Sequence, residues 1–198
     1  MRKSIILIWL VVIFTGIALL FWHSEFVYSV PTPIPKDYMA VNPGTIVRLP
    51  ESLHPKNNKP VFLHFFNPDC PCSKFNITHF KSLVNRYSNE ATFAIVVMNN
   101  RRYTSQQIQN KFDLNIPVVF DTSIAISCGV YSTPQAVIIN ASQKLYYRGN
   151  YNRSRYCTDN KSNYAQQALD SLLHNNHPAI FNQFALKAYG CSLPNCSK

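Results

Sequence analysis

The chain contains two kinds of apolar run, and their lengths predict two different environments. Residues 4–22, SIILIWLVVIFTGIALLFW, carry no charge and are interrupted only by Ser, Thr and Gly. This length is close to the roughly 20 residues that a membrane-spanning helix needs. The later apolar runs are much shorter and are bounded by Pro, Gly and polar residues, as is typical of strands in a folded domain. The pattern therefore predicts a membrane anchor followed by a folded domain.

The residues on either side of the long apolar run favour an uncleaved anchor. Arg2 and Lys3 precede the run, whereas Glu25 is the only full charge in residues 23–35. Positive charge is retained on the cytoplasmic side of a membrane. A cleavable signal peptide would have a shorter apolar region followed by small residues at the cleavage site. We expect a single-pass protein of the inner (cytoplasmic) membrane, with its N-terminus in the cytoplasm and its domain in the periplasm or outside the cell.

The anchor spans residues 1–22, and two regions of different composition follow it. In residues 23–50 the prolines at 31, 33 and 35 predict an extended spacer that holds the domain off the membrane. In residues 51–198, runs of strand length alternate with helical periodicity, so we expect a mixed α/β fold with one sheet covered by helices on both faces. Besides a possible edge strand at 45–49, the expected strands span residues 60–67, 91–98, 117–120, 135–140 and 144–148, and the expected helices span 73–87, 104–112, 122–128, 161–174 and 178–189.

Charge and composition exclude several classes of function. The net charge is +10, and Arg2 and Lys3 account for two of these charges, which leaves +8 on the exported part. The charges are scattered, so anionic lipid or acidic partners suit them better than nucleic acid does. With five glycines and no phosphate-cradling glycine-rich loop, we expect no organic cofactor. Six cysteines, all beyond the anchor, fit an oxidising compartment.

The strongest candidate chemistry follows the first expected strand. Residues 61–66 show no alternation, which predicts a strand buried on both faces. The tripeptide NPD breaks this strand, Cys70 and Cys72 follow at once, and helical periodicity begins at Ser73. Cysteines at the first turn of a helix meet unpaired N–H groups and the positive end of the helix dipole, which stabilise a thiolate. A reactive Cys70 open to solvent is therefore expected, and two buried core cysteines are the structural alternative.

Two motifs together resemble the thioredoxin superfamily. The first is the strand FLHFFN with Cys70 after a two-residue gap, and the second is GVYSTP at residues 129–134, followed by the strand AVII. Their spacing is similar to that of membrane-anchored, exported redoxins of the TlpA-like and peroxiredoxin-like groups, and the resemblance spans about residues 60–173. It implies a thioredoxin-like sheet, a cis bond between Thr133 and Pro134, and a substrate-positioning role for both residues opposite Cys70. The Thr133 backbone would then offer an extended substrate peptide a hydrogen-bonding edge.

The cysteine motif departs from the family pattern. A C-x-x-C pair would place its second cysteine at position 73, which is serine, whereas Cys72 makes a C-x-C motif. In one interpretation Cys70 attacks a substrate disulfide and Cys72 resolves the mixed disulfide, and the tight C-x-C ring favours donating or isomerising disulfides. In the other, Cys70 acts alone and a separate thiol resolves it. Lys74 would lower the pKa of Cys70, and Asp69 would oppose this. The resemblance implies a thiol–disulfide oxidoreductase acting on thiols or disulfides of exported proteins.

The other four cysteines have structural and functional interpretations. Cys191 and Cys196, in CSLPNC, suggest a local structural disulfide, with a flexible C-terminal resolving pair as the alternative. A structural bridge between Cys128 and Cys157 is the simplest interpretation of the remaining two, and core thiols or a resolving role are its alternatives. Six cysteines allow fifteen pairings, so the sequence does not determine the connectivity.

Two other functions stay open for the same fold. Peroxiredoxins carry Thr or Ser three residues before the reactive cysteine, where this chain has Asn67, although Arg148 or Arg155 would supply a cation. A Cu(I) chaperone would use Cys70, Cys72 and a histidine such as His79, because Cu(I) favours thiolates. The C-x-C spacing differs from that of copper-delivery proteins with this fold, so no metal site is assigned. His64, in the first strand, is interpreted as a core histidine, and a redox-inert adaptor is a third possibility.

Overall fold

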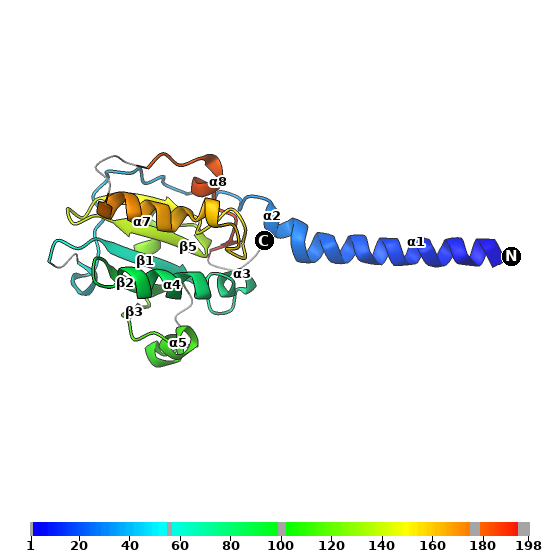
Figure 1. Ribbon diagram of the computed structural model, residues 1–198, viewed down its shortest axis with the longest axis horizontal. Coiled ribbons are helices and arrows are strands. Elements are labelled where there is room, and N and C mark those ends of the chain that lie inside the picture. Colours follow the sequence, from blue (N-terminus) through cyan, green and yellow to red (C-terminus); the bar gives the residue numbers. More distant parts are fainter. Residues whose placement is uncertain (1, 55–56, 99–101, 175–178, 194–198) are drawn as a thin grey trace.

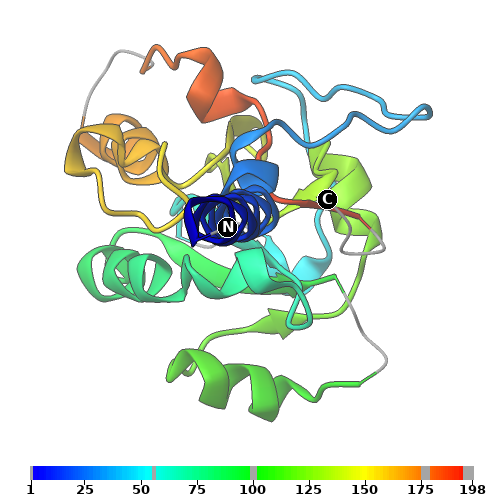
Figure 2. The ribbon, with the colours of Figure 1, turned by 90° about the vertical axis from the view of Figure 1, so that its right-hand side faces the viewer.

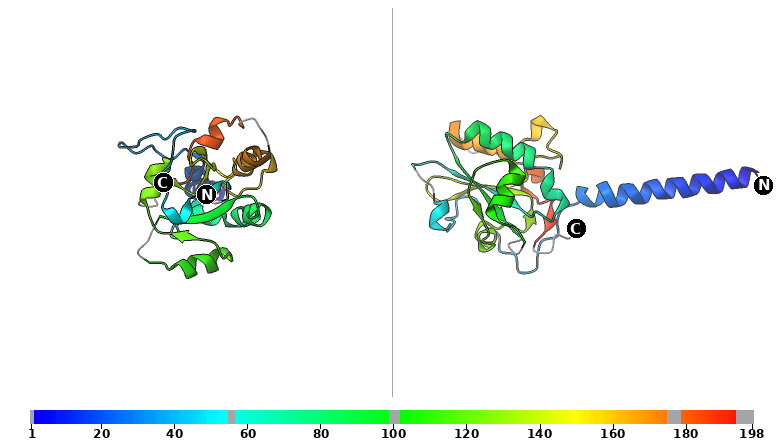
Figure 3. Two further views of the ribbon diagram at one scale, coloured as in Figure 1. Left: turned by 90° about the vertical axis from the view of Figure 1, so that its left-hand side faces the viewer. Right: turned by 90° about the horizontal axis from the view of Figure 1, so that it is seen from below.

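The N-terminal helix stands apart from the domain. The computed structural model describes residues 2–54, 57–98, 102–174 and 179–193. α1 (Arg2–Phe21) continues through a π-helical turn, η1 (Trp22–Phe26), into α2 (Val27–Ser29), and no residue of α1 is buried. Figures 1 and 3 show α1 projecting from one end of the domain, which α2 meets. Within the described ranges it is the one helix long and apolar enough to cross a membrane.

A mixed sheet of five strands, in the order β3-β2-β1-β5-β6, forms the centre of the domain. β1 is parallel to β2, and β2 to β3, whereas β5 is antiparallel to β1 and to β6. The strands are β1 (Val61–Phe66), β2 (Thr92–Val97), β3 (Val118–Val119), β5 (Gln135–Ile139) and β6 (Leu145–Gly149). A βαβ unit followed by a hairpin and a helix, in this strand order, is a thioredoxin-like fold. The predicted fold class is confirmed.

β1 is buried on both faces, which explains its unbroken apolar sequence. Its alternate residues Phe62 and Phe66 pack with α4 (Ile77–Tyr87) and α7 (Tyr164–His174), whereas Leu63 packs in a second core with α6 (Ser123–Cys128). Successive side chains of a strand point to opposite faces, so the sheet separates the two cores. Figure 2 shows α4 and α7 on one side of the sheet and α6 on the other.

Local signals determine the ends of two further helices. α5 (Ser105–Phe112) begins at a capping box: the Gln107 N–H donates to the Thr104 hydroxyl (3.2 Å), and the Thr104 N–H donates to the Gln107 side chain (2.9 Å). α6 ends at Gly129, whose φ of +66° is a left-handed conformation that suits glycine. A 3₁₀ turn, η3 (Asn160–Ser162), takes the place of the expected first turn of α7. These helices and the five strands agree with the predictions to within a few residues.

The two helices nearest the site differ from the prediction. The helix expected over residues 73–87 is divided into α3 (Pro71–Lys74) and α4. Asn76 occupies the N-cap position of α4 and is buried, and its side chain accepts a hydrogen bond from the Cys157 thiol (3.5 Å) and makes no capping bond to the helix. The helix expected over 178–189 is reduced to α8 (Gln183–Leu186), because the Asn182 side chain caps it late by accepting from the Ala185 N–H (3.1 Å). Residue 178 lies outside the described residues.

The segments before β1 pack on the domain. Residues 45–49 form one isolated bridge, Ile46 with Lys144, instead of a strand, because Val47 and Leu49 turn into the core beside α6. A short 3₁₀ turn, η2 (Glu51–Leu53), follows.

The proline-rich segment is also docked. The Thr32 N–H donates to the Ala188 carbonyl (2.8 Å), the Thr32 hydroxyl donates to the Gly190 carbonyl (2.6 Å), and the Tyr38 hydroxyl donates to the Gly129 carbonyl (3.0 Å). Figure 1 shows this segment running over the domain surface after α2. The extended chain after the helix is therefore bonded to the domain at Thr32 and Tyr38 and does not run free of it.

Candidate functional site: a buried cysteine cluster beside a cis proline

The CPC motif lies at the carboxyl end of β1, as predicted. The Cys70 N–H donates to the Asn67 carbonyl (3.1 Å), and Cys70 is the extended N-cap residue of α3. Pro71 occupies the first helical position, where its fixed φ and missing N–H are well tolerated. α3 has only four residues. The helix dipole available to Cys70 is therefore smaller than the predicted continuous helix would supply.

The second motif lies beside the first. The peptide bond between Thr133 and Pro134 is cis, as predicted, and Thr133 ends the short strand β4 (Ser132–Thr133). Pro134 and Cys72 line the same cavity, so the fold brings together two motifs that are distant in sequence. The Thr133 hydroxyl is buried and has no hydrogen-bond partner among the described residues.

The C-terminal segment adds a third component that the sequence analysis did not place. β7 (Cys191–Ser192) pairs antiparallel with β4, with Cys191 opposite Thr133. Cys191 thereby lies in one buried cluster with Cys70 and Cys72, and Tyr28 of α2 packs against it. We call these three cysteines the cysteine cluster. The spacing of CSLPNC indicates a cysteine pair but contains no information about which strand edge the segment meets.

The cysteine cluster is closed to solvent, which corrects the expectation of an open Cys70. The exposed fractions are 0% for Cys70, 6% for Cys72 and 2% for Cys191. The cover comes from two chain segments that the sequence pattern does not connect with the motif, β7 and the end of the N-terminal helix at Tyr28. A cysteine that exchanges disulfides must be accessible to its partner. Exchange with another protein therefore requires this cover to move.

The bonding state of the cysteines differs from the predicted pairings. Cys70 is in a disulfide, whereas Cys72, Cys128, Cys157 and Cys191 carry thiols. A Cys70–Cys72 bond is thus not formed in this structure. The predicted Cys191–Cys196 disulfide involves Cys196, which lies outside the described residues. The predicted Cys128–Cys157 bridge is also wrong: both residues carry thiols, Cys128 is the buried last residue of α6, and Cys157 packs against the core on the other side of the sheet.

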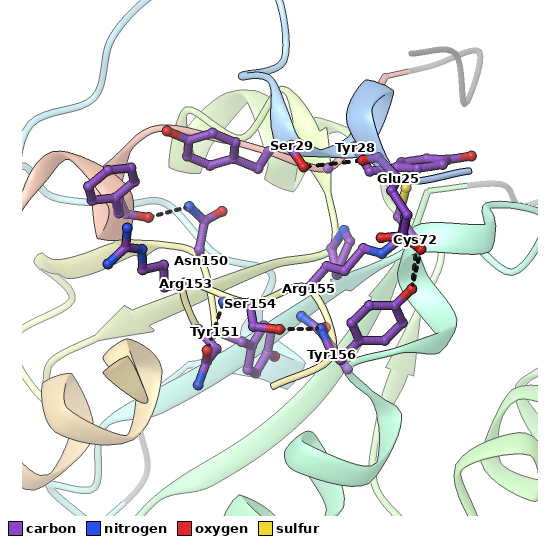
Figure 4. Close-up of a pocket in the computed structure, with 16 residues that line it drawn as sticks. Glu25, Tyr28, Ser29, Cys72, Asn150, Tyr151, Arg153, Ser154, Arg155 and Tyr156 are labelled. Carbon is purple, nitrogen blue, oxygen red and sulfur yellow. Dashed lines mark hydrogen bonds and ion pairs between the residues drawn. The ribbon is translucent and has the colours of Figure 1, made fainter. Parts of the chain in front are cut away.

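A cavity of about 460 Å³ opens beside Cys72. Figure 4 shows Cys72 at its edge, between Glu25 and Tyr28 of the N-terminal helix and Arg155 and Tyr156 of the loop after β6. Arg155 forms an ion pair with Glu25 (2.7 Å), and its guanidinium lies 4.8 Å from the centre of the Tyr28 ring, within the range of a cation–π interaction. Arg155 therefore joins the N-terminal helix to the domain next to the cysteine cluster.

Cys128 and Cys157 have surroundings that disfavour the thiolate. Burial raises the pKa of the Cys128 thiol to about 12, although Arg148 opposes the shift, and burial alone raises the pKa of Cys157 to about 12. The nucleophile in disulfide exchange is the thiolate. Both residues are thus core thiols, one of the alternatives that the sequence left open.

Other residues considered for chemistry lie elsewhere. Arg148 donates to the carbonyl oxygens of Val41 (2.8 Å) and Cys128 (3.4 Å), and it is Arg155 that lines the cavity. His64 is a buried core histidine, as interpreted: its Nδ1 lies 2.6 Å from the Tyr151 hydroxyl, and burial lowers its pKa to about 3. In the part of the chain that the structure describes, no three His, Cys, Asp or Glu side chains gather as a metal site requires.

A family model matches residues 40–194, which include the CPC motif, the cis proline and β7. Its description is a domain of unknown function, DUF6436. The chain belongs to the DUF6436 family. No curated protein matches this DUF6436 chain. The family description assigns no activity, so the function has to be argued from the site.

Solved structures similar to this DUF6436 domain support the fold. A hypothetical protein from Sinorhizobium meliloti 1021 is similar with a TM-score of 0.62 and 15% identity over 78% of this chain and 95% of that chain. An uncharacterized conserved protein from Geobacillus kaustophilus has a TM-score of 0.56 and 18% identity over 77% and 93%. A lower similarity is found to dsbF from MTB in mixed oxidized and reduced forms, with a TM-score of 0.48 and 20% identity over 62% and 84%. At these identities the similarity concerns the fold alone.

Proposed function

We propose that this protein is a membrane-tethered thiol–disulfide oxidoreductase that acts on thiols or disulfides of exported proteins. The observation that carries the proposal is the cysteine cluster itself: three cysteines from two distant segments pack together beside a cis proline, and Cys70 is in a disulfide. A redox-inert adaptor would not need this concentration of sulfur at one edge of the sheet. Electrons would enter and leave through partner thiols, without an organic cofactor or a metal.

In the proposed reaction Cys70 is the nucleophile and Cys72 resolves. Partner thiols first reduce the disulfide of Cys70. The Cys70 thiolate then attacks one sulfur of a substrate disulfide, a mixed disulfide forms, and the other substrate cysteine leaves as a thiolate. The Cys72 thiolate then attacks Cys70, so that a Cys70–Cys72 bond forms and the second substrate cysteine is released. The substrate gains two electrons and the protein loses two. The reverse sequence donates a disulfide.

Thr133 and Pro134 are the proposed substrate-positioning residues. The cis bond belongs to the loop beside Cys72, and β4, directly before it, pairs with another strand. A strand edge binds an extended peptide by main-chain hydrogen bonds. A substrate polypeptide on this edge would bring its cysteine to the cluster.

The proposed location follows from the N-terminal helix. Arg2 and Lys3 support a cytoplasmic N-terminus through the positive-inside rule, and in the proposed arrangement α1 is in the inner membrane and the domain is in the periplasm or at the cell exterior. α1 is unburied over its whole length, as a lipid-embedded helix would be.

The site argues against the peroxidase and copper alternatives. The side chain of Asn67, at the position of the peroxiredoxin Thr or Ser, accepts from the Asp69 N–H (3.1 Å) and thus closes the local turn. Arg148 binds backbone carbonyls on the α6 side. For copper, His79 lies against the Tyr151 ring, with 5.8 Å between ring centres, and no cluster of three metal-binding side chains includes it among the described residues.

The test is disulfide exchange by the full chain in detergent, with a fluorescent disulfide-bonded peptide as substrate. Replacing the nucleophile with Cys70→Ser is expected to lower the exchange rate on the order of 1,000-fold. Cys128→Ser, which removes a core thiol, is the matched control and is expected to retain the wild-type rate. Equal rates for wild type and Cys70→Ser would overturn the proposal. Rapid consumption of hydrogen peroxide that survives in Cys72→Ser would replace it with a peroxidase.

A further inference from the structure

We propose that β7 occupies the substrate-binding edge of β4 as an internal substrate and that Cys191 is a third exchanging cysteine. An external polypeptide that binds this edge in place of β7 must then carry glycine directly before its cysteine. This inference rests on the proposed function and names the substrate class of that site.

The pairing of β7 is that of a peptide bound to a strand edge. Thr133 lies opposite Cys191 and Ser132 opposite Ser192, and the Leu193 N–H extends the contact by donating to the Tyr131 carbonyl (3.1 Å). Addition of a strand to an exposed edge is a general mode of peptide recognition. Here the protein's own C-terminal segment provides that strand and delivers a cysteine to Cys70 and Cys72.

The residue before Cys191 determines which sequences fit. A Cβ atom added at Gly190 would lie 2.1 Å from the Thr133 carbonyl oxygen and 2.6 Å from the Ser132 hydroxyl oxygen. The Thr133 contact is with backbone, which cannot rotate away. In this register the strand therefore approaches β4 too closely for any side chain at that position, and the edge selects a Gly–Cys sequence.

The start of the proline-rich segment fastens this internal strand. The Thr32 hydroxyl donates to the Gly190 carbonyl (2.6 Å) and lies 3.2 Å from the Ser132 hydroxyl, and Thr32 is buried. Tyr28, four residues earlier, packs on the cysteine cluster. The cover thus consists of a two-residue strand and the residues that leave the N-terminal helix, without a large packed core of its own. Such peripheral segments open at a lower free energy than core strands do.

The exchange at Cys191 is balanced without an external oxidant. The Cys191 thiol loses a proton, and its thiolate attacks Cys70, whose disulfide is already present. A Cys70–Cys191 bond forms, the bond between Cys70 and its previous partner breaks, and that partner leaves as a thiolate that takes up a proton. One disulfide and one thiol are present before and after the step.

The test uses the full chain in detergent and three variants. Gly190→Ala forces β7 off the edge of β4. Thr32→Val removes the hydrogen bond from the Thr32 hydroxyl to the Gly190 carbonyl while keeping the shape of the side chain. Gly16→Ala is the matched control, because an added Cβ there meets nothing within 4 Å. Each protein is first reduced with dithiothreitol, which is then removed. Exchange is measured with two synthetic peptides that differ in one residue, Gly-Cys-Ser and Ala-Cys-Ser, each carrying a glutathione mixed disulfide. Circular dichroism checks that each variant is folded.

We expect Gly190→Ala to exchange with the Gly-Cys-Ser peptide at least about tenfold faster than wild type and Gly16→Ala, since the open fraction of the site limits the rate. The Ala-Cys-Ser peptide stays slow in every variant, and Thr32→Val shows a smaller increase. In a glutathione buffer, disulfide mapping by mass spectrometry finds a Cys70–Cys191 bond in wild type.

Contrary results separate this inference from the proposed function. A folded Gly190→Ala that exchanges no faster than Gly16→Ala, or equal rates for the two peptides, overturns the internal substrate, while exchange that depends on Cys70 still supports the oxidoreductase. Absence of exchange in all variants, with faster alkylation of the Cys72 thiol in Gly190→Ala, overturns the function and leaves β7 as a cover only.

Discussion

Two groups of cysteines in this domain are wholly or partly buried, but different elements cover them. Cys128 is the buried last residue of α6, and the half-buried Cys157 packs against the opposite core beside Asn76. The cysteine cluster instead lies under β7 and Tyr28, at the end of the domain that meets the N-terminal helix. Exposed fractions alone do not separate the groups. The difference is that a short strand can leave an edge, whereas a helix cannot leave the core without unfolding the domain.

The largest difference is expected in thiol reactivity at pH 8. At a pKa of about 12, the Cys128 and Cys157 thiolates should be roughly 1,000-fold rarer than at the ordinary value of 9.0. Cys72, in contrast, lines the cavity. Iodoacetamide labelling followed by mass spectrometry should find Cys72 modified before either of the other two. In urea, all three should label at similar rates. If Cys128 were labelled as fast as Cys72 in the folded protein, the proposed difference in reactivity between core thiols and the cysteine cluster would be contradicted.

The same two pKa values predict how stability depends on pH. Both are raised in the folded state, so the contribution of these thiols is fully present below pH 9 and is lost as the pH rises from 9 towards 12. Urea unfolding of the Cys128→Ala variant should show a weaker decline across this window than wild type, on the order of 1 kcal/mol or more at its upper end. Cys72→Ala serves as the control, and a decline that is identical in the two variants would contradict the assigned surroundings.

Cys72→Ser is expected to have an intermediate effect on turnover, and it tests which cysteine of the cluster is the nucleophile and which one resolves. If Cys72 resolves, the variant should accumulate a mixed disulfide between Cys70 and substrate and turn over about 10–100-fold more slowly. Intact-protein mass spectrometry measures the accumulated adduct. Cys157→Ser, outside the cluster, should accumulate none. A Cys72→Ser variant with wild-type turnover would transfer the resolving role to Cys191, which the double variant with Cys191→Ser then tests.

The smallest effect concerns the connection between helix and loop. Glu25→Gln removes the charge from the Glu25–Arg155 pair, which is partly exposed, and such pairs contribute about 0.2–1 kcal/mol. We expect labelling of Cys72 to rise by a factor of about 2–5, and the wild-type rate to rise similarly at high salt. Glu51→Gln, in the η2 turn away from the cavity, is the control. An effect of equal size in both variants would show that the pair does not fasten the cover.

The sequence predicted the parts of the site that depend on local pattern. Unbroken apolar runs predicted β1, the position of Cys70 after it, and the strand after Pro134. A strand that is buried on both faces requires such a run of consecutive apolar residues, so it can be recognised in the sequence. The cis bond came from the resemblance and is confirmed. The start of the helix predicted over residues 104–112 agrees with the structure, where a capping box at Thr104 makes both of its hydrogen bonds within four residues.

The remaining features depend on contacts between distant segments. The break between α3 and α4 involves Cys157, which is far from Asn76 in sequence. Docking of the proline-rich segment depends on Thr32 meeting Ala188 and Gly190, and closure of the site depends on Cys191 meeting Thr133. None of these pairings has a periodicity that a single sequence displays. The error of an open Cys70 follows from the same cause, since its cover belongs to both ends of the chain.

The hydrogen bonds of Thr32 also determine how far the domain can travel. Only two residues separate Ser29, at the end of α2, from Thr32, where the chain is already bonded to the domain. Such a short link allows neither rotation through a wide angle nor a long reach. In the proposed arrangement, with α1 in a bilayer, the cysteine cluster would stay at a nearly constant, small height above the lipid headgroups, and a partner would have to bring its own cysteines to that height.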